Sequence, residues 1–332
     1  MSVTGQENYD AAALDALMQG FDRAGSDLVG NRVYTRLCGR EGAPQILVDV
    51  HFDEIGMLVS DVKENGFLSV AAVGGLDART LASARVRIYG KKIIDGVVSS
   101  TPPHLATGEP KATKIEDILV DTGYPTEELS ELVSIGTRVG FTPRYRALGT
   151  RQITGKGFDN KACAAIAAAA ILDTDPAKLA GDVHLLLSVH EETDKRGGTV
   201  VGGFALKPDY AMVIDVNLGF MRGADKHETV AMGKGPSITR SAIVGRRLTA
   251  MTEALATREN IPWQISVAPK STGTNTEALH LVGGGIPVVD VGLPLTSMHT
   301  YMEALDMEDA ENLKKLVAAF LCDKEIGEVF GK

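Results

Sequence analysis

Acidic and imidazole side chains that could bind metal ions recur directly after short apolar segments of this chain. They are His51 and Asp53 after residues 45–50, Glu191 and Glu192 after residues 184–189, and Asp215 after residues 210–214. Short apolar runs of this kind are typical of buried strands. Ligands gather at the carboxyl ends of strands in open α/β sheets, so these side chains could converge on one site.

Two further candidates lie in loop-like stretches. Asp159 stands at a loop-to-helix junction in GKGFDNKA, and His299 follows the apolar segment 287–291 in LPLTSMHTYME. Histidines with several carboxylates suit zinc, cobalt or manganese. A shared carboxylate can bridge two ions that activate one water, and a second, unligated carboxylate can take its proton. A lone carboxylate after a strand is usually a turn or cap residue, so the metal-hydrolase prediction depends on the whole set.

The surrounding pattern predicts an α/β protein with an insertion. Helical spacing is found at 162–172, 246–258 and 307–329. Before these segments lies a stretch of short β-type runs separated by Gly-, Pro- and Asn-containing turns, with one helical segment at 125–133. The β-type runs are 67–73, 84–89, 93–98, 118–121 and 138–141. We therefore expect a discontinuous α/β domain from residues 1–60 and 150–332, and a small β-rich domain from residues 61–149.

The composition narrows the class of protein. The 332 residues are 44% hydrophobic and 23% charged, with 34 Lys and Arg against 43 Asp and Glu and a net charge of −9. Such an acidic chain does not favour binding to nucleic acid or to an anionic membrane. Its three cysteines are far apart and the N-terminal segment has no basic or apolar region. These features predict a cytoplasmic protein.

Several longer motifs of this chain resemble those of a known protein family. HFDEIG at 51–56 resembles the HxDEIG signature of the glutamyl and deblocking aminopeptidases, the tetrahedral-aminopeptidase family of dinuclear metallopeptidases, family 42. Further similar segments follow in the family's order and cover most of the chain. They are DGVVSSTPPHL at 95–105, DILVDTG at 117–123, VSIGTRVGF at 133–141, GKGFDNKAC at 155–163, SVHEETDKRGG at 188–198, IDVNLG at 214–219, TGTNTEALHLVGGGIP at 272–287 and MHTYMEALD at 298–306.

The resemblance implies a zinc-exopeptidase-like fold, a mixed central sheet with helices on both faces, and a barrel-like inserted domain used for dimerisation. It also implies an aminopeptidase that acts on short peptides through a water between two divalent ions, zinc or cobalt. The implied roles are His51 and Asp215 on one ion, Glu192 and His299 on the other, Asp159 bridging both, Glu191 as general base and Asp53 orienting His51. Dimers of such a protein would build a homo-oligomer, up to a tetrahedral dodecamer.

The chain also departs from the family. EETDKRGG replaces the usual EEVGLRGA, so that Asp194 and Lys195 stand where small and apolar residues are common. Asn275 replaces an aspartate, and Leu295 and Thr296 stand where an arginine often precedes the MHS motif. These changes leave every implied ligand in place, but the resemblance does not imply which N-terminal residue of a substrate this protein prefers. An acidic-residue preference would need a basic group in the pocket, for which Lys195, Arg196 and Lys270 are the candidates.

Other functions stay open beside the aminopeptidase. One is a deacylase that acts on N-acyl amino acids, and another is a non-catalytic oligomeric scaffold. Relatives have been labelled glucanases, but glycoside hydrolysis normally needs two positioned carboxyls and no metal pair. An intact base, Glu191, beside an intact ligand, Glu192, argues against a scaffold that has lost its activity.

Overall fold

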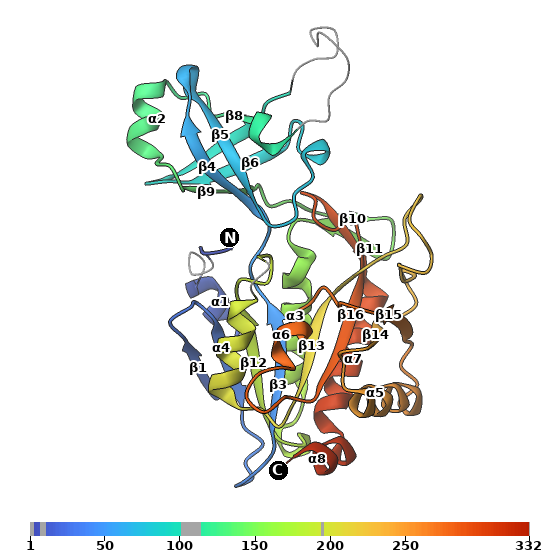
Figure 1. Ribbon diagram of the computed structural model, residues 1–332. Coiled ribbons are helices and arrows are strands. Elements are labelled where there is room, and N and C mark those ends of the chain that lie inside the picture. The colour runs from blue at the N-terminus through green and yellow to red at the C-terminus, as the bar shows by residue number, and fades with distance from the viewer. Residues whose placement is uncertain (1–2, 7–10, 101–113, 194–195, 332) are drawn as a thin grey trace.

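The computed structural model describes residues 3–6, 11–100, 114–193 and 196–331, and these form two bodies (Figure 1). The larger body is a mixed sheet with helices, and the smaller is a closed barrel above it. Asp194, Lys195 and the end of the segment 95–105 lie outside the described residues. Within the described part of the chain, no helix combines the length and apolarity that crossing a membrane requires.

The large sheet has eleven strands, of which the central four run parallel. Its main path is β1 (Arg23–Ser26), β2 (Arg32–Arg36), β12 (Asp182–Ser188), β3 (Gln45–His51), β13 (Tyr210–Leu218), β16 (Val288–Thr296), β17 (Glu303–Asp306), β11 (Gln152–Gly155) and β10 (Tyr145–Leu148). β14 (Ser237–Ser241) pairs with β16, and β15 (Gln264–Ala268) pairs with β14. The parallel strands β12, β3, β13 and β16 therefore end at one edge, where polar side chains can meet.

Helices cover both faces of this sheet. On β3, Ile46, Val48 and Val50 point into the larger core, which contains residues of α1, α3, α5, α7 and α8, while Leu47 points into a second core beneath α4 and α6. The helices are α1 (Ala11–Leu17), α3 (Phe158–Asp173), α4 (Gly197–Leu206), α5 (Arg246–Arg258), α6 (Thr276–Leu279), α7 (Met307–Cys322) and α8 (Lys324–Phe330). Alternation along a strand explains the division, since successive side chains point to opposite faces. The predicted mixed α/β fold is confirmed.

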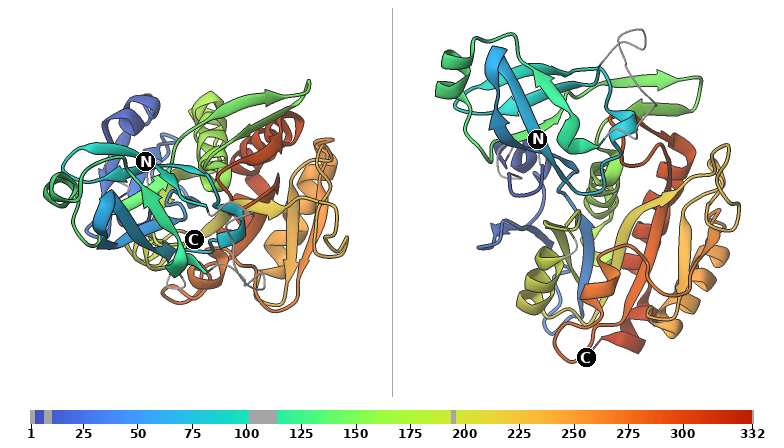
Figure 2. Two further views of the ribbon diagram at one scale, coloured as in Figure 1. Left: turned by 90° about the horizontal axis from the view of Figure 1, so that it is seen from above. Right: turned by 45° about the horizontal axis from the view of Figure 1, so that its top comes forward.

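The smaller body is a six-stranded closed barrel with its own core. Its strands, in barrel order, are β4 (Gly56–Val62), β5 (Phe67–Val73), β8 (Leu119–Asp121), β7 (Ile93–Val98), β6 (Arg85–Tyr89) and β9 (Arg138–Phe141). Met57, Leu68, Val120 and Val139 are fully buried inside it, and α2 (Thr126–Leu132) joins that core through Leu129. Seen from above, the barrel leaves the segment with α5 and β15 uncovered (Figure 2).

The ends of the barrel differ slightly from the expected insertion 61–149. β4 begins at Gly56, a short connection after β3 ends at His51, so the chain enters the barrel before residue 61. β10, inside the expected insertion, pairs with β11 in the large sheet, with Tyr145 opposite Gly155. Pairing between these two strands decides where β10 belongs.

The helical segment expected at 307–329 is two helices. α7 ends at Cys322 and α8 begins at Lys324, with Asp323 between them in an extended conformation. The Asp323 carboxylate accepts the backbone N–H of Ile326 at 2.8 Å and caps α8. A capping aspartate starts a new helix here because it satisfies an N–H that has no partner within the helix.

The short 3₁₀ turns in the described part of the chain are Glu64–Gly66, Ala78–Thr80, Ile115–Asp117 and Pro176–Lys178.

Candidate metal centre

Side chains from five places in the sequence meet at the carboxyl edge of the parallel strands. His51 ends β3, the Glu191–Glu192 pair follows β12, and Asp215 lies on β13. Asp159 belongs to the first turn of α3, and His299 lies in the connection between β16 and β17. The structure thus brings these predicted residues together at one place, with Asp53 directly beside them.

Asp159 lies at the middle of the cluster and faces two imidazoles. Its Oδ1 is 3.0 Å from Nε2 of His51, and its Oδ2 is 3.4 Å from Nε2 of His299. The carboxylate is buried, and its backbone is held by Glu303, whose Oε2 accepts the N–H groups of Phe158 at 2.7 Å and Asp159 at 3.2 Å. One carboxylate therefore presents one oxygen to each side of the cluster.

Each imidazole also faces a second carboxylate. Nε2 of His51 is 3.4 Å from Oδ1 of Asp215, and Nε2 of His299 is 3.5 Å from Oε2 of Glu192. Donor atoms of His51, Asp159 and Glu192 all lie within 4.8 Å of one another. The cluster is thus two imidazole–carboxylate pairs on either side of Asp159.

Asp53 orients His51 and fixes the backbone of the glutamate pair. Nδ1 of His51 is 3.1 Å from the Asp53 carbonyl oxygen and 3.6 Å from its Oδ1. When these oxygens hold the imidazole proton on Nδ1, Nε2 is unprotonated and its lone pair can bind a metal ion. The Asp53 carboxylate also accepts the N–H groups of Glu191 and Glu192, each at 3.2 Å, and the Thr4 hydroxyl at 2.7 Å.

The charged groups of the cluster favour the binding of a cation. Burial and the nearby Asp159 charge raise the pKa of Glu192 well above its usual range. Burial alone would lower the pKa of His51, but Asp215 and Asp159 raise it well above its usual range. Several carboxylates crowded in a buried space with imidazoles are a donor set of oxygen and nitrogen that suits zinc, cobalt or manganese. The residues present therefore fit metal ions.

Glu191 stands beside the cluster with its carboxylate turned toward Arg196. Burial raises its pKa to about 7, while the Arg196 guanidinium acts in the opposite direction. Nε of Arg196 is 3.4 Å from Oε1 of Glu191, and its Nη1 donates to Oε2 of Glu277 at 2.7 Å. A carboxylate with a pKa near neutrality next to a metal cluster can act as a general base.

The sequence patterns did not single out three features of the site. Glu303 supports the Asp159 backbone, although it lies only four residues after His299 in the MHTYMEALD segment. Glu54 pairs with both Lys156 and Lys161 behind the same loop. The barrel contributes Gly75, where an added Cβ would lie 2.7 Å from Nδ1 of His299, so only glycine lets the chain pass this close.

The departures from the family motifs that lie within the described residues, Asn275, Leu295 and Thr296, do not touch the cluster directly. Asn275 is buried and donates from Nδ2 to the Ser188 hydroxyl at 2.8 Å, behind the site. Leu295 is fully buried at the end of β16, opposite Leu305 of β17. None of these residues contributes a donor atom to the cluster formed by the two imidazole–carboxylate pairs and Asp159.

Residues 30–316 match the model of the M42 glutamyl aminopeptidase family. The chain belongs to this family. It is 30% identical to the lysyl aminopeptidase of Pyrococcus furiosus over 330 residues, which cover 96% of this chain and 93% of the relative. The fold resembles that of an aminopeptidase from the archaeon Desulfurococcus kamchatkensis with a TM-score of 0.91 and 26% identity, covering 100% of this chain and 94% of that one.

A second solved structure, the TET1 peptidase of Pyrococcus horikoshii, matches with a TM-score of 0.84 and 28% identity over 97% of this chain and 96% of that one. Like other M42 proteins, this chain is an aminopeptidase, a hydrolase that acts on peptide bonds. The M42 family is metal-dependent, in agreement with the donor cluster around Asp159.

Proposed function

We propose that this M42 enzyme removes N-terminal residues from short peptides with two divalent ions, zinc or cobalt, and with Glu191 as general base. The observation that carries the proposal is the position of Asp159, whose two oxygens each face a separate imidazole. A carboxylate between two ligand pairs is the arrangement that a dinuclear hydrolase requires.

In this proposal His51 and Asp215 hold one ion, Glu192 and His299 hold the other, and Asp159 bridges both. Bound ions would polarise the scissile carbonyl and lower the pKa of the attacking water. Glu191 would accept the proton of that water at its carboxylate and return it to the leaving amine. Its nearly neutral pKa suits both transfers.

Asp53 and Glu303 would act as positioning residues in the same reaction. The Asp53 carbonyl keeps Nε2 of His51 free for the ion, and its carboxylate ties down the backbone that carries the base and the neighbouring ligand. Glu303 holds the backbone at Asp159 by two N–H bonds. Such supporting contacts commonly set the affinity of a metal site.

We propose further that the enzyme is a homo-oligomer built from dimers, in which the barrel is the dimerisation domain. The Pyrococcus horikoshii relative can assemble into a tetrahedron or a large octahedral shell, which supports an assembly of that kind. A tetrahedral dodecamer would admit only short or unfolded peptides to its interior. The cytoplasmic location stays a prediction from cysteine usage.

The test is hydrolysis of aminoacyl-p-nitroanilides, short peptides and N-acyl amino acids by the purified protein, with chelator and after zinc or cobalt is added back. Chelator-sensitive release of N-terminal residues that metal restores supports the proposal. Cleavage of the N-acyl amino acids alone would support the deacylase. Absence of turnover on all substrates by protein that holds its metal would support the scaffold.

A further inference from the structure

A polar cavity of about 260 Å³ opens beside the metal centre, on the sheet face that carries α4 and α6. Asp215 of the metal cluster forms part of its wall, and β14, β15 and β16 contribute the rest together with residues 269–274. The volume is several times the roughly 30 Å³ share of one water, so the cavity can accept a long side chain. A substrate whose scissile bond lies at the cluster would have its N-terminal side chain next to this opening.

The depth of the cavity is set by the strand register. Asp215 on β13 is opposite Gly292 on β16, and Asp290 stands two residues before Gly292 on the same face. Two residues along a strand span about 7 Å, a reach comparable to that of an extended lysine side chain. At Gly292 an added Cβ would lie 2.7 Å from Cβ of Asn217 and from the Ser237 hydroxyl, so glycine keeps the floor open.

The walls carry acid and hydroxyl groups. Asp215, Glu228 and Asp290 line the cavity, and no lysine, arginine or histidine of the described part of the chain lines it. Asp290 is buried and accepts the hydroxyls of Thr274 at 2.6 Å and Thr276 at 2.7 Å. Burial raises the pKa of Asp290, while the hydroxyls of Thr239, Thr274 and Thr276 act in the opposite direction by donating to its carboxylate.

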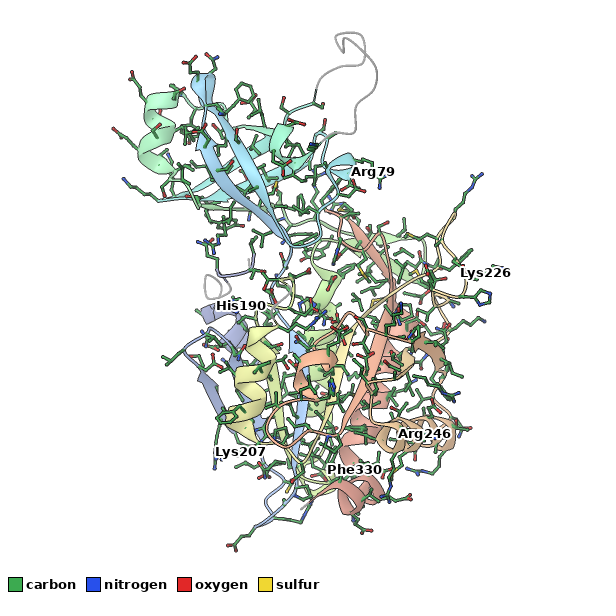
Figure 3. The ribbon with its side chains drawn as sticks, viewed as in Figure 1. Arg79, His190, Lys207, Lys226, Arg246 and Phe330 are labelled. Carbon is green, nitrogen blue, oxygen red and sulfur yellow. The ribbon has the colours of Figure 1, made fainter. Side chains whose placement is uncertain are left out.

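Glu228 adds a second available charge. Its side chain is exposed and forms no hydrogen bond or ion pair with any residue in the described part of the chain. Lys226 belongs to the same loop and lies on the outer side of the molecule (Figure 3), with Nζ 5.7 Å from the centre of the Phe220 ring. None of the basic residues of this loop, Arg222, Lys226 and His227, lines the cavity.

Two of the basic groups considered for an acidic substrate, Arg196 and Lys270, do not line this cavity. Arg196 is engaged by Glu191 and Glu277, and Lys270 does not belong to its lining although both of its neighbours in the chain do. Lys195 lies outside the described residues. Among the described residues, the lining of the cavity therefore holds no cation that could pair with an acidic side chain.

We propose that this cavity binds the side chain of the substrate's N-terminal residue and selects lysine or arginine, with Glu228 and Asp290 as the groups that recognise the cation. The proposal rests on the proposed aminopeptidase function and specifies its substrate class. Specificity of this kind follows from differential charge: both carboxylates attract a cation, while an uncharged side chain is not attracted and leaves the Glu228 carboxylate unpaired.

The experiment compares lysine with norleucine, which has the same four-carbon chain without the ammonium. With metal-loaded enzyme, we expect kcat/KM for lysyl-p-nitroanilide to exceed that for the norleucyl substrate by about tenfold or more, and that for the glutamyl substrate by about a hundredfold. Glu228→Gln should lower the lysine-to-norleucine ratio severalfold, and Glu228→Lys should lower it further. The control Glu328→Gln removes an exposed charge on α8 and should leave the ratio unchanged.

A binding measurement separates this inference from the proposed function. Calorimetric titration with lysinamide and norleucinamide reads the preference without turnover, and we expect about tenfold tighter binding of lysinamide to the unmodified enzyme. Hydrolysis that favours norleucine or glutamate, or a ratio insensitive to Glu228→Lys, would overturn the cavity assignment and leave the aminopeptidase intact. Absence of all peptide hydrolysis together with a retained lysinamide preference would overturn the proposed function instead.

Discussion

The guanidinium of Arg196 lies against the carboxylate of Glu191, with 3.4 Å between Nε and Oε1. The same guanidinium donates to Glu277, whose Oε1 in turn accepts the backbone N–H of Gly273 at 2.8 Å. Arg196 therefore connects the proposed general base to the loop that lines the cavity. Because burial raises the pKa of Glu191 to about 7, the opposing effect of Arg196 helps to keep the base ionised near neutral pH.

Replacing Arg196 by methionine should move the acid limb of the pH–rate profile to higher pH. The base must be deprotonated to accept a proton, and the guanidinium lowers its pKa. Without that charge the pKa of Glu191 rises, so a smaller fraction is active at any pH below neutrality. The measurement is kcat/KM of metal-loaded enzyme from weakly acidic to weakly basic pH. Arg79→Met, on the exposed barrel surface, is the control, and an unmoved acid limb in R196M would contradict the assignment.

Glu191→Gln should retain the metal and the fold but lose most turnover. A neutral amide cannot take a proton from water, and general-base catalysis typically contributes about 10²–10⁴-fold to a rate. The side chain is not one of the proposed ligands, so metal content measured by elemental analysis should equal that of the unmodified enzyme. Substantial hydrolysis by this variant, under conditions where the unmodified enzyme loses activity with chelator, would refute the role of Glu191.

Asp159→Asn should weaken both metal ions together. The carboxylate faces His51 on one side and His299 on the other, so losing its charge removes attraction from both positions. Asp215→Asn is the matched control, because Asp215 faces only His51 and its loss should weaken one ion. Metal stoichiometry after dialysis against a weak chelator reads the difference. Two tightly held ions in the D159N protein would show that Asp159 does not bridge.

The spacing of apolar residues along the sequence predicted those helices and strands whose formation depends on residues close together in the chain. The segments 67–73, 93–98 and 138–141 are strands with those bounds, and the helix expected at 246–258 is α5. His51 ends β3, at the edge where the parallel strands end, whereas Asp215, expected directly after its strand, lies within β13, which continues to Leu218. Periodicity and strand-end rules use information that lies within a few residues.

Other parts depended on contacts between distant segments. Glu303 acts on Phe158 and Asp159 through backbone N–H groups, and no side-chain pattern marks such an acceptor. Glu54 meets Lys156 and Lys161 only after β3 and β11 have folded into place. The cavity charge likewise depends on register, because Asp290 reaches the cavity by its place opposite Val213 on β13.

Asn275→Asp, which restores the residue common in the family, should destabilise this protein. Asn275 is buried and donates to the Ser188 hydroxyl at 2.8 Å, and that hydroxyl donates its single proton to Oδ1 of Asp49 at 2.6 Å. An aspartate at 275 could not donate, so two buried carboxylates would compete for one hydroxyl proton. We expect the free energy of unfolding at neutral pH to fall by about 2–4 kcal/mol.

The sign of the pH dependence tests the same explanation. A buried aspartate at position 275 would have a raised pKa in the folded protein, so the penalty grows as pH rises above the unfolded-state value of about 3.9 and shrinks in acid, where the acid can donate again. Urea unfolding at several pH values, compared with the unmodified protein, measures this difference. Asn260→Asp, at an exposed turn, is the matched control and should change stability little. A variant N275D that is as stable as the control at neutral pH would show that Ser188 can serve both carboxylates.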